Sequence, residues 1–337
     1  MLTVLTRGTF LSSANRQPSH LPFTDMMADQ NDSHQRIFGT PLEPLFNHCR
    51  SAENQELVQY TLSLLIKKNS EDVKTATPEQ FIFRTNESVQ FLFLTCEKLK
   101  LPEETKFQAM NLFERFMLKH VKELYSYVLT SKNRNKKKSW MDIKARVHNQ
   151  VFLRVISCIQ IASKVTSHYR ILSTGRARKI LKDAGHNYTL DGILCSELRI
   201  LKTLGFNVTF PSVLVYLETV LEMLGYTSIE VKLLHSMSIS LLEVCYLRHG
   251  IIYTRLHQAL SGSHCCFSEE EKKKFSAVHA DKMLLVASVV SAVAFIVEQS
   301  NADEVISHVS RLTEIDSEDI VDFSAVIIRF LQDTEST

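Results

Sequence analysis

The chain has 337 residues, of which 45% are hydrophobic and 23% charged, and its 39 basic side chains are nearly balanced by 37 acidic ones. This composition is typical of a globular protein with about two domains of ~100–200 residues each, and it excludes a disordered or polycationic chain. The formal net charge is only +2, so a contact with nucleic acid or an anionic membrane would need a local patch of charge.

The leading segment and the first helices follow in chain order. Residues 1–50 hold four of the seven prolines and no sustained hydrophobic period, which predicts a flexible leader. We expect a first helix over residues 51–68 and a linker over 69–78. Residues 81–99 are too apolar for a surface helix and predict a central one, and Pro102 with two following glutamates predicts the start of another.

A basic segment over residues 130–146 interrupts this pattern. Because a run of positive charges cannot be buried unpaired, the segment predicts an exposed insert ahead of a helix over 147–165. Three interpretations stay open: a solvated loop, a nuclear import signal, or a contact with nucleic acid phosphates. The basic residues that would serve either function are Lys132, Arg134, Lys136, Lys137 and Lys138.

The rest of the chain also predicts helices, because Pro211 is the only proline after residue 102. The expected helices span residues 173–184, 190–204, 212–224, 229–249, 251–260, 277–298 and 317–331. Residues 283–297 are apolar but shorter than the ~20 residues of a membrane span, so we expect a buried core helix. The pattern favours an all-α protein with two consecutive bundles, over residues 51–210 and 211–332.

Sequence motifs for chemistry are scarce. No phosphate-binding loop, zinc-protease motif or nucleophile elbow occurs, so we predict no cofactor and no enzymatic activity. The seven cysteines include no C-x-x-C pair, which favours reduced thiols. His257, His264, Cys265 and Cys266 fit the spacing of a tetrahedral zinc site poorly, so no metal site is predicted.

One charged residue lies within an apolar stripe. In the helix expected over 190–204, Glu197 follows Ile193 by four residues and precedes Leu201 by four, which places its carboxylate in the seam of the helix. A buried charge needs a partner, because removing the counter-charge costs ~3–5 kcal/mol. Lys164 is the nearest candidate cation. Two simpler interpretations also stay open: Glu197 reaches water at the edge of the stripe, and Lys164 only complements the helix dipole.

Residues 85–210 resemble a cyclin box, the five-helix module of the cyclin family. The matching segments are residues 101–116, 161–164 and 196–206, and residues 210–212 resemble the entry to a second box. The resemblance implies two consecutive cyclin-like five-helix bundles, of which the second is divergent. The acidic pair that usually follows the matched lysine, and the docking motif of the first helix, are absent.

The resemblance also implies a function. More narrowly, residues 50–330 are similar to a meiotic branch of the family, which implies a noncatalytic regulator that promotes maturation of recombination intermediates into crossovers. In cyclins the residues that match Lys164 and Glu197 contact the kinase. The implied partners are proteins, such as cyclin-dependent kinase 2 and other meiotic crossover factors, in the nucleus and also the cytoplasm, with neither a membrane nor direct DNA binding. The alternative is a nucleic-acid-associated helical scaffold that uses the basic insert.

Overall fold

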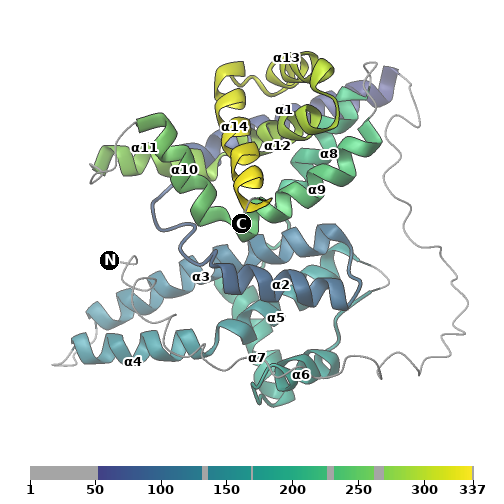
Figure 1. Ribbon diagram of the computed structural model, residues 1–337. Helices are drawn as coiled ribbons and strands as arrows, with labels where there is room; N and C mark the ends of the chain where they lie inside the picture. Colours follow the sequence, from purple (N-terminus) through teal and green to yellow (C-terminus); the bar gives the residue numbers. More distant parts are fainter. Residues whose placement is uncertain (1–51, 131–135, 168–169, 226–230, 262–268, 336–337) are drawn as a thin grey trace, which may run out of the picture.

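The computed structural model describes residues 52–130, 136–167, 170–225, 231–261 and 269–335, and every regular element in these ranges is a helix (Figure 1). The all-α fold predicted from the sequence is confirmed. The expected leader, Lys132, Arg134, His264, Cys265 and Cys266 lie outside the described residues.

The first bundle is built around α5 (Val151–Thr166), which lies between the other helices of this half in Figure 1. Residues 153–163 of α5 are buried on all sides, as expected for a helix that is apolar all round. Its neighbours are α2 (Asn86–Lys98), α3 (Glu103–Thr130), α4 (Lys136–Asn149), α6 (Thr174–Asp183) and α7 (Leu190–Thr203).

The second bundle has α12 (Lys282–Val297) at its centre. Residues 283–294 are buried except for Leu284, which confirms the buried core helix expected there. No single described helix meets the length and hydropathy of a membrane span, and residues 273–280 with α12 meet them only as a pair bent by 62°. Against α12 pack α8 (Val213–Leu224), α9 (Val231–Leu247), the 3-10 turn η2 (Gln299–Asn301), α13 (Ala302–Thr313) and α14 (Ser317–Glu335). The remaining helices of this half are α10 (His249–Ser261), which packs on α9 and α14, and α11 (Glu269–Ala280).

The N-terminal helix α1 (Ala52–Lys74) precedes the first bundle in sequence but packs against α8, α11 and α12 of the second (Figure 1). Asn69 fixes this packing, because its amide donates to Asp281 at 2.8 Å and its carbonyl oxygen accepts from the backbone N–H of Lys282 at 2.9 Å. The helix also continues to Lys74, so the expected linker over residues 69–78 is shorter than predicted.

The two bundles share one continuous core. Polar contacts also join them: the amide of Gln108 on α3 donates to the carbonyl oxygen of Val208 at 2.7 Å, and the Ser212 hydroxyl donates to Glu104 at 2.8 Å. The α3 helix therefore contacts both the segment between the bundles and the first turn of the second bundle.

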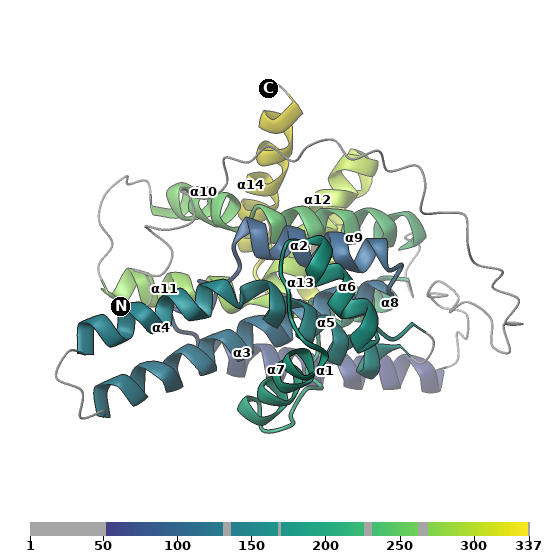
Figure 2. The ribbon, with the colours of Figure 1, turned by 90° about the horizontal axis from the view of Figure 1, so that it is seen from below.

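The basic segment corrects one expectation. The described lysines Lys136, Lys137 and Lys138 are exposed, but residues 136–149 form α4, which lies beside the C-terminal half of α3 (Figure 2). Trp140 packs edge-on against Tyr125 of α3, with ring centroids 5.0 Å apart, and Ile143 is buried. These two side chains give α4 an apolar edge that the charge pattern hides. The helix expected over residues 147–165 is consequently two helices, which meet at Gln150.

The second bundle corrects two more expectations. The helix expected over 277–298 is broken at Asp281, whose carboxylate caps α12 by accepting from the backbone N–H of Leu284 at 2.7 Å. A helix start signal therefore lies inside what the apolar pattern treats as one run. Neither α11 nor α13 is predicted by the sequence, although Val305 and Val309 give α13 a buried stripe.

Candidate partner-binding site

The last turn of α5 carries Lys164. The helix ends at Ser167, whose backbone turns to the extended conformation, and the Ser163 hydroxyl oxygen accepts from the backbone N–H of Leu172 at 3.0 Å. This contact holds the following segment against the end of α5. Lys164 lies where a positive charge is favoured by the helix dipole, and its side chain is 45% exposed.

Glu197 lies in the middle of α7. The helix begins at Thr189, whose hydroxyl oxygen accepts from the backbone N–H of Gly192 at 3.0 Å, and it ends with Gly205 in the left-handed conformation at φ +64°. The backbone N–H of Phe206 bonds back to the carbonyl oxygen of Leu201 at 2.8 Å, which is a Schellman-type end. Both ends of α7 are therefore fixed by local hydrogen bonds, and the position of Glu197 with them.

Hydrogen bonds between α5 and α7 set their register. The Ser157 hydroxyl donates to the Ser196 oxygen at 2.8 Å, and the guanidinium of Arg154 donates to the same oxygen at 2.7 Å. Arg154 also donates to Gln150 at 2.7 Å. Burial lowers the pKa of Arg154. The acceptors that its guanidinium meets, Ser196 and Gln150, are both neutral. The residue next to Ser196 is Glu197, so the same register brings its carboxylate to α5.

The structure brings Lys164 and Glu197 together as an ion pair between Nζ and Oε1. The Glu197 side chain is only 10% exposed, which agrees with its predicted place in the apolar seam between Ile193 and Leu201. Glu197 therefore lies in the seam and pairs with Lys164, and only the edge of its side chain is open to water. The pair lies at the edge of the bundle, with the carboxylate inside and the ammonium facing out.

A row of exposed leucines borders the ion pair. Leu190, Leu194 and Leu198 follow one another at four-residue steps on α7, and all three are exposed. On the opposite side of the same helix, Ile193 and Ile200 face the core. Val165, next to Lys164, is also exposed. An exposed apolar row beside a charged pair is typical of a protein interface.

Comparisons with known proteins agree with this geometry. Residues 66–209 match the family model "Cyclin, N-terminal domain", a range that runs from within α1 to beyond α7. The chain is 34% identical over 297 residues to "Cyclin N-terminal domain-containing protein 1" of Mus musculus, covering 86% of this chain and 88% of the relative. It is 32% identical over 277 residues to the protein of the same name from Homo sapiens, covering 81% and 84%. The chain belongs to the cyclin N-terminal domain family.

This membership confirms the cyclin resemblance stated from the sequence. The matched region contains all of α2 to α7, and so both Lys164 and Glu197 of the cyclin box. Members of the cyclin family are generally regulatory rather than catalytic. Among the described residues, no group of histidines, cysteines or carboxylates could hold a metal ion.

Of the other basic residues singled out from the sequence, the three that the structure describes do not join this site. Lys136, Lys137 and Lys138 form the first turn of α4. In Figure 1 this end of α4 lies at the left, far from α7. The ammonium of Lys136 donates to the carbonyl oxygen of Leu129 at 2.6 Å. The cyclin box therefore carries two separate surfaces, the α5–α7 face and the basic first turn of α4.

A second ion pair, between Arg84 and Glu114, was not predicted from the sequence. Arg84, just before α2, makes a two-pronged contact with Glu114 of α3, in which the second prong measures 2.9 Å. Burial lowers the pKa of Arg84, but the Glu114 carboxylate more than compensates, so the pKa lies above its usual value. A signal for Glu114 was present, because it falls between Met110 and Met117 at steps of four and three, in the same pattern as Glu197.

Proposed function

We propose that the chain is a noncatalytic regulator of meiotic recombination that promotes crossover formation by binding partner proteins. The partner at the α5–α7 face is a kinase of the cyclin-dependent class, such as cyclin-dependent kinase 2. Meiotic crossover factors are the further partners, and the chain acts in the nucleus and also in the cytoplasm. Family membership and the resemblance of Lys164 and Glu197 to the kinase-contacting residues of cyclins support this proposal.

The observation that carries the proposal is the ion pair beside an exposed apolar row. A half-exposed ammonium paired with a buried carboxylate can donate charge-assisted hydrogen bonds to a second protein. Leu194 and Leu198 supply the apolar area that such a contact buries. The carboxylate holds the ammonium in one position, so the pair fixes the orientation of the partner rather than acting in chemistry.

Binding of the full chain to purified cyclin-dependent kinase 2 tests the proposal. We expect Lys164→Ala and Glu197→Gln each to weaken binding by about tenfold or more, which corresponds to ~1.4 kcal/mol. The double variant Leu194→Ser/Leu198→Ser should weaken it further, since it removes the apolar part of the surface. Isothermal titration calorimetry gives the dissociation constants, and the melting temperature of each free variant shows whether it is folded.

Lys179→Ala is a matched control, because Lys179 is an exposed lysine of α6 and not a member of the Lys164–Glu197 pair. It should bind the kinase as the wild type does. Equal affinity for all variants, with each of them folded, would show that the α5–α7 face is not the kinase-binding surface.

The exposed basic turn at the start of α4 supports the alternative of a nucleic-acid-associated scaffold. Contacts of lysines with phosphates release counterions, so binding would weaken steeply with added salt. In that case Lys136→Ala/Lys137→Ala/Lys138→Ala would reduce both DNA affinity and its salt dependence. Under the kinase-binding proposal, DNA affinity is low and this triple variant leaves kinase binding unchanged. A salt titration of DNA binding distinguishes the two.

A further inference from the structure

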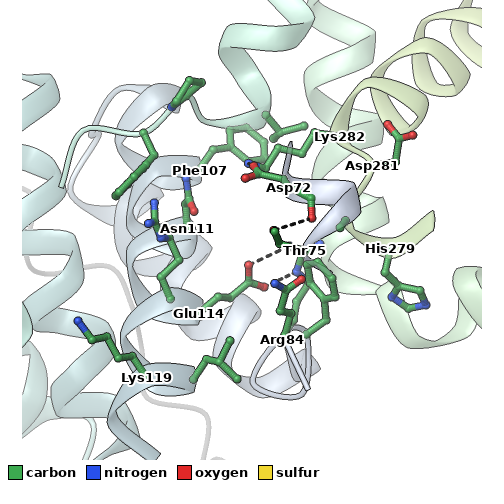
Figure 3. A pocket seen from close by; sticks show the side chains of 18 of the residues that line it. Asp72, Thr75, Arg84, Phe107, Asn111, Glu114, Lys119, His279, Asp281 and Lys282 are labelled. Atoms are coloured by element: carbon green, nitrogen blue, oxygen red, sulfur yellow. Dashed lines mark hydrogen bonds and ion pairs between the residues drawn. The ribbon is translucent and has the colours of Figure 1, made fainter. Parts of the chain in front are cut away.

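A cavity of about 660 Å³ opens where the two bundles meet α1 (Figure 3). Figure 3 shows Asn111 and Lys119 of α3 on one side of it and Asp72 of α1 and Lys282 of α12 on the other. Neither Lys164 nor Glu197 lines it. The cavity is therefore separate from the α5–α7 face. Its volume is that of a site for a small molecule or a side chain.

Positive charge predominates on the cavity wall. Six cationic side chains line it against four carboxylates, and His279 adds no charge because burial lowers its pKa to about 3. The cationic residues are Lys68, Arg84, Arg115, Lys119, Lys122 and Lys282. The carboxylates are Asp72, Glu114, Glu123 and Asp281. Two of the cations also meet carboxylates outside the lining, Lys68 with Glu71 at 3.4 Å and Lys122 with Glu79 at 3.9 Å.

Most of these charges are already paired within the chain. Arg84 is held by Glu114, and Asp72 accepts from both Lys68 at 3.0 Å and Lys282 at 3.3 Å. Figure 3 shows Arg84 and Glu114 meeting at the base of the view. These paired residues form part of the cavity wall. The lining cations without an ion pair to a described residue lie on α3.

Arg115 is the principal unpaired cation. Its guanidinium lies over the ring of Phe210, and it forms no ion pair with any residue that the structure describes. Burial lowers the pKa of Arg115 to about 10, and the more distant Asp72 only partly offsets this. The group is still charged at neutral pH. Its hydrogen-bond donors face a cavity in which no carboxylate meets them.

Asn111 adds a donor of the same kind one turn earlier on α3. Its side-chain nitrogen is buried and has no hydrogen-bond partner among the described residues, although an unsatisfied buried donor costs ~1–3 kcal/mol. Asn111, Arg115 and Lys119 follow one another at four-residue steps, so they lie along one face of the helix. Lys119 is exposed at the mouth and likewise forms no ion pair with a described residue.

We propose that this cavity binds a phosphate monoester, with Arg115, Asn111 and Lys119 as donors to its oxygens. A phosphate group offers three acceptor oxygens and a charge of about −1.5 to −2 at pH 7. This matches a row of three donors, two of which are cations without an ion pair to any described residue. A planar guanidinium is suited to contact two oxygens of phosphate at once. Phe210 and Leu118 line the cavity beside Arg115 and suit the organic group of the ester.

Titration of the full chain with phenyl phosphate, followed by calorimetry, tests the site. The wild type should bind phenyl phosphate, and Arg115→Gln should weaken binding by about tenfold or more, the effect of losing one charged donor pair. Asn111→Asp is the sharper variant, because it replaces the buried donor by a carboxylate of the same shape. It should abolish measurable binding and raise the melting temperature, since the new carboxylate pairs with Arg115.

Arg178→Gln is the matched control, because Arg178 is an exposed arginine of α6 outside the cavity, and it should bind phenyl phosphate as the wild type does. Wild type that binds no phenyl phosphate at millimolar concentration would overturn the proposal. Equal binding by Asn111→Asp would do the same. If benzoate binds as tightly as phenyl phosphate, the site binds any organic anion and is not specific for phosphate, which would contradict the proposal.

Two further probes identify the source of the phosphate. If inorganic phosphate binds as tightly as phenyl phosphate, the organic group contributes nothing, and a monoester is not the ligand. If peptides with phosphothreonine bind more tightly than either, the monoester is a phosphorylated segment of a protein.

Discussion

Two ion pairs of similar chemistry lie in different surroundings in the first bundle. In both, the carboxylate is nearly buried, with the Glu114 side chain 11% exposed and that of Glu197 10% exposed. The cations differ: Arg84 is 7% exposed, whereas Lys164 is 45% exposed. The guanidinium of Arg84 also lies over the ring of Tyr246 from the second bundle, 4.2 Å from the centroid.

The difference separates a structural pair from a surface pair. Water can replace Lys164 beside Glu197, but it cannot replace Arg84 without also leaving the aromatic rings around the guanidinium unpacked. Exposed pairs contribute ~0–1 kcal/mol to stability, and losing one partner of a buried pair costs ~3–5 kcal/mol. Exposure of the cation, more than of the carboxylate, therefore indicates which pair is available to a partner protein.

The largest expected effect tests this comparison directly. Arg84→Met should lower the free energy of unfolding by about 3–5 kcal/mol, because it leaves Glu114 without its counter-charge. Lys164→Met should lower it by no more than about 1 kcal/mol. Chemical denaturation of the two variants at neutral pH measures both changes.

The double variant Arg84→Met/Glu114→Leu is the control. It should recover much of the lost stability, because no unpaired charge is then buried. Similar losses for Arg84→Met and Lys164→Met would contradict the comparison and would make the Lys164–Glu197 pair a structural one.

Much of the candidate site could be predicted from the sequence, because Glu197 carries a local signal. An acid within an apolar stripe needs a counter-charge, and the helix that carries Lys164 is its neighbour in the bundle. Glu114 carries the same signal between Met110 and Met117. Its partner Arg84 does not, because it lies outside any helix, 30 residues away.

The cavity could not be predicted in this way. Its walls come from α1, α3 and α12, and Lys282 is 210 residues from Asp72. No local pattern relates such distant residues. The helix boundaries failed for a related reason: Trp140 gives α4 an apolar edge only because α3 lies beside it, and the cap of α12 at Asp281 lies within an apolar run.

A smaller effect concerns how the stability of the protein near Arg84 depends on pH. The surroundings of Arg84 include two buried histidines: burial first, and then the charge of Arg84, lowers the pKa of His279 to about 3 and that of His249 well below its usual value. In the unfolded chain both titrate near 6.5. The unfolded state thus binds protons that the folded state does not bind. The free energy of unfolding therefore decreases as pH falls from about 6.5 toward 3. For His279 this costs about 2 kcal/mol at pH 5 relative to pH 7, and the cost of His249 has the same sign.

The pH profile of the wild type alone does not isolate this effect, because burial raises the pKa of Glu104 to about 7, and a carboxyl with a raised pKa gains stability as pH falls. The difference between wild type and His249→Phe does isolate it. Phenylalanine fits this position, because the His249 ring packs on Tyr253 at 4.4 Å and its Nε2 has no partner among the described residues. We expect the variant to be at least as stable as the wild type at pH 7 and to gain stability relative to it as pH falls toward 5. A difference that does not change with pH would mean that His249 takes up its proton in the folded protein as readily as in the unfolded chain, and that its surroundings beside Arg84 are more hydrated than their burial indicates.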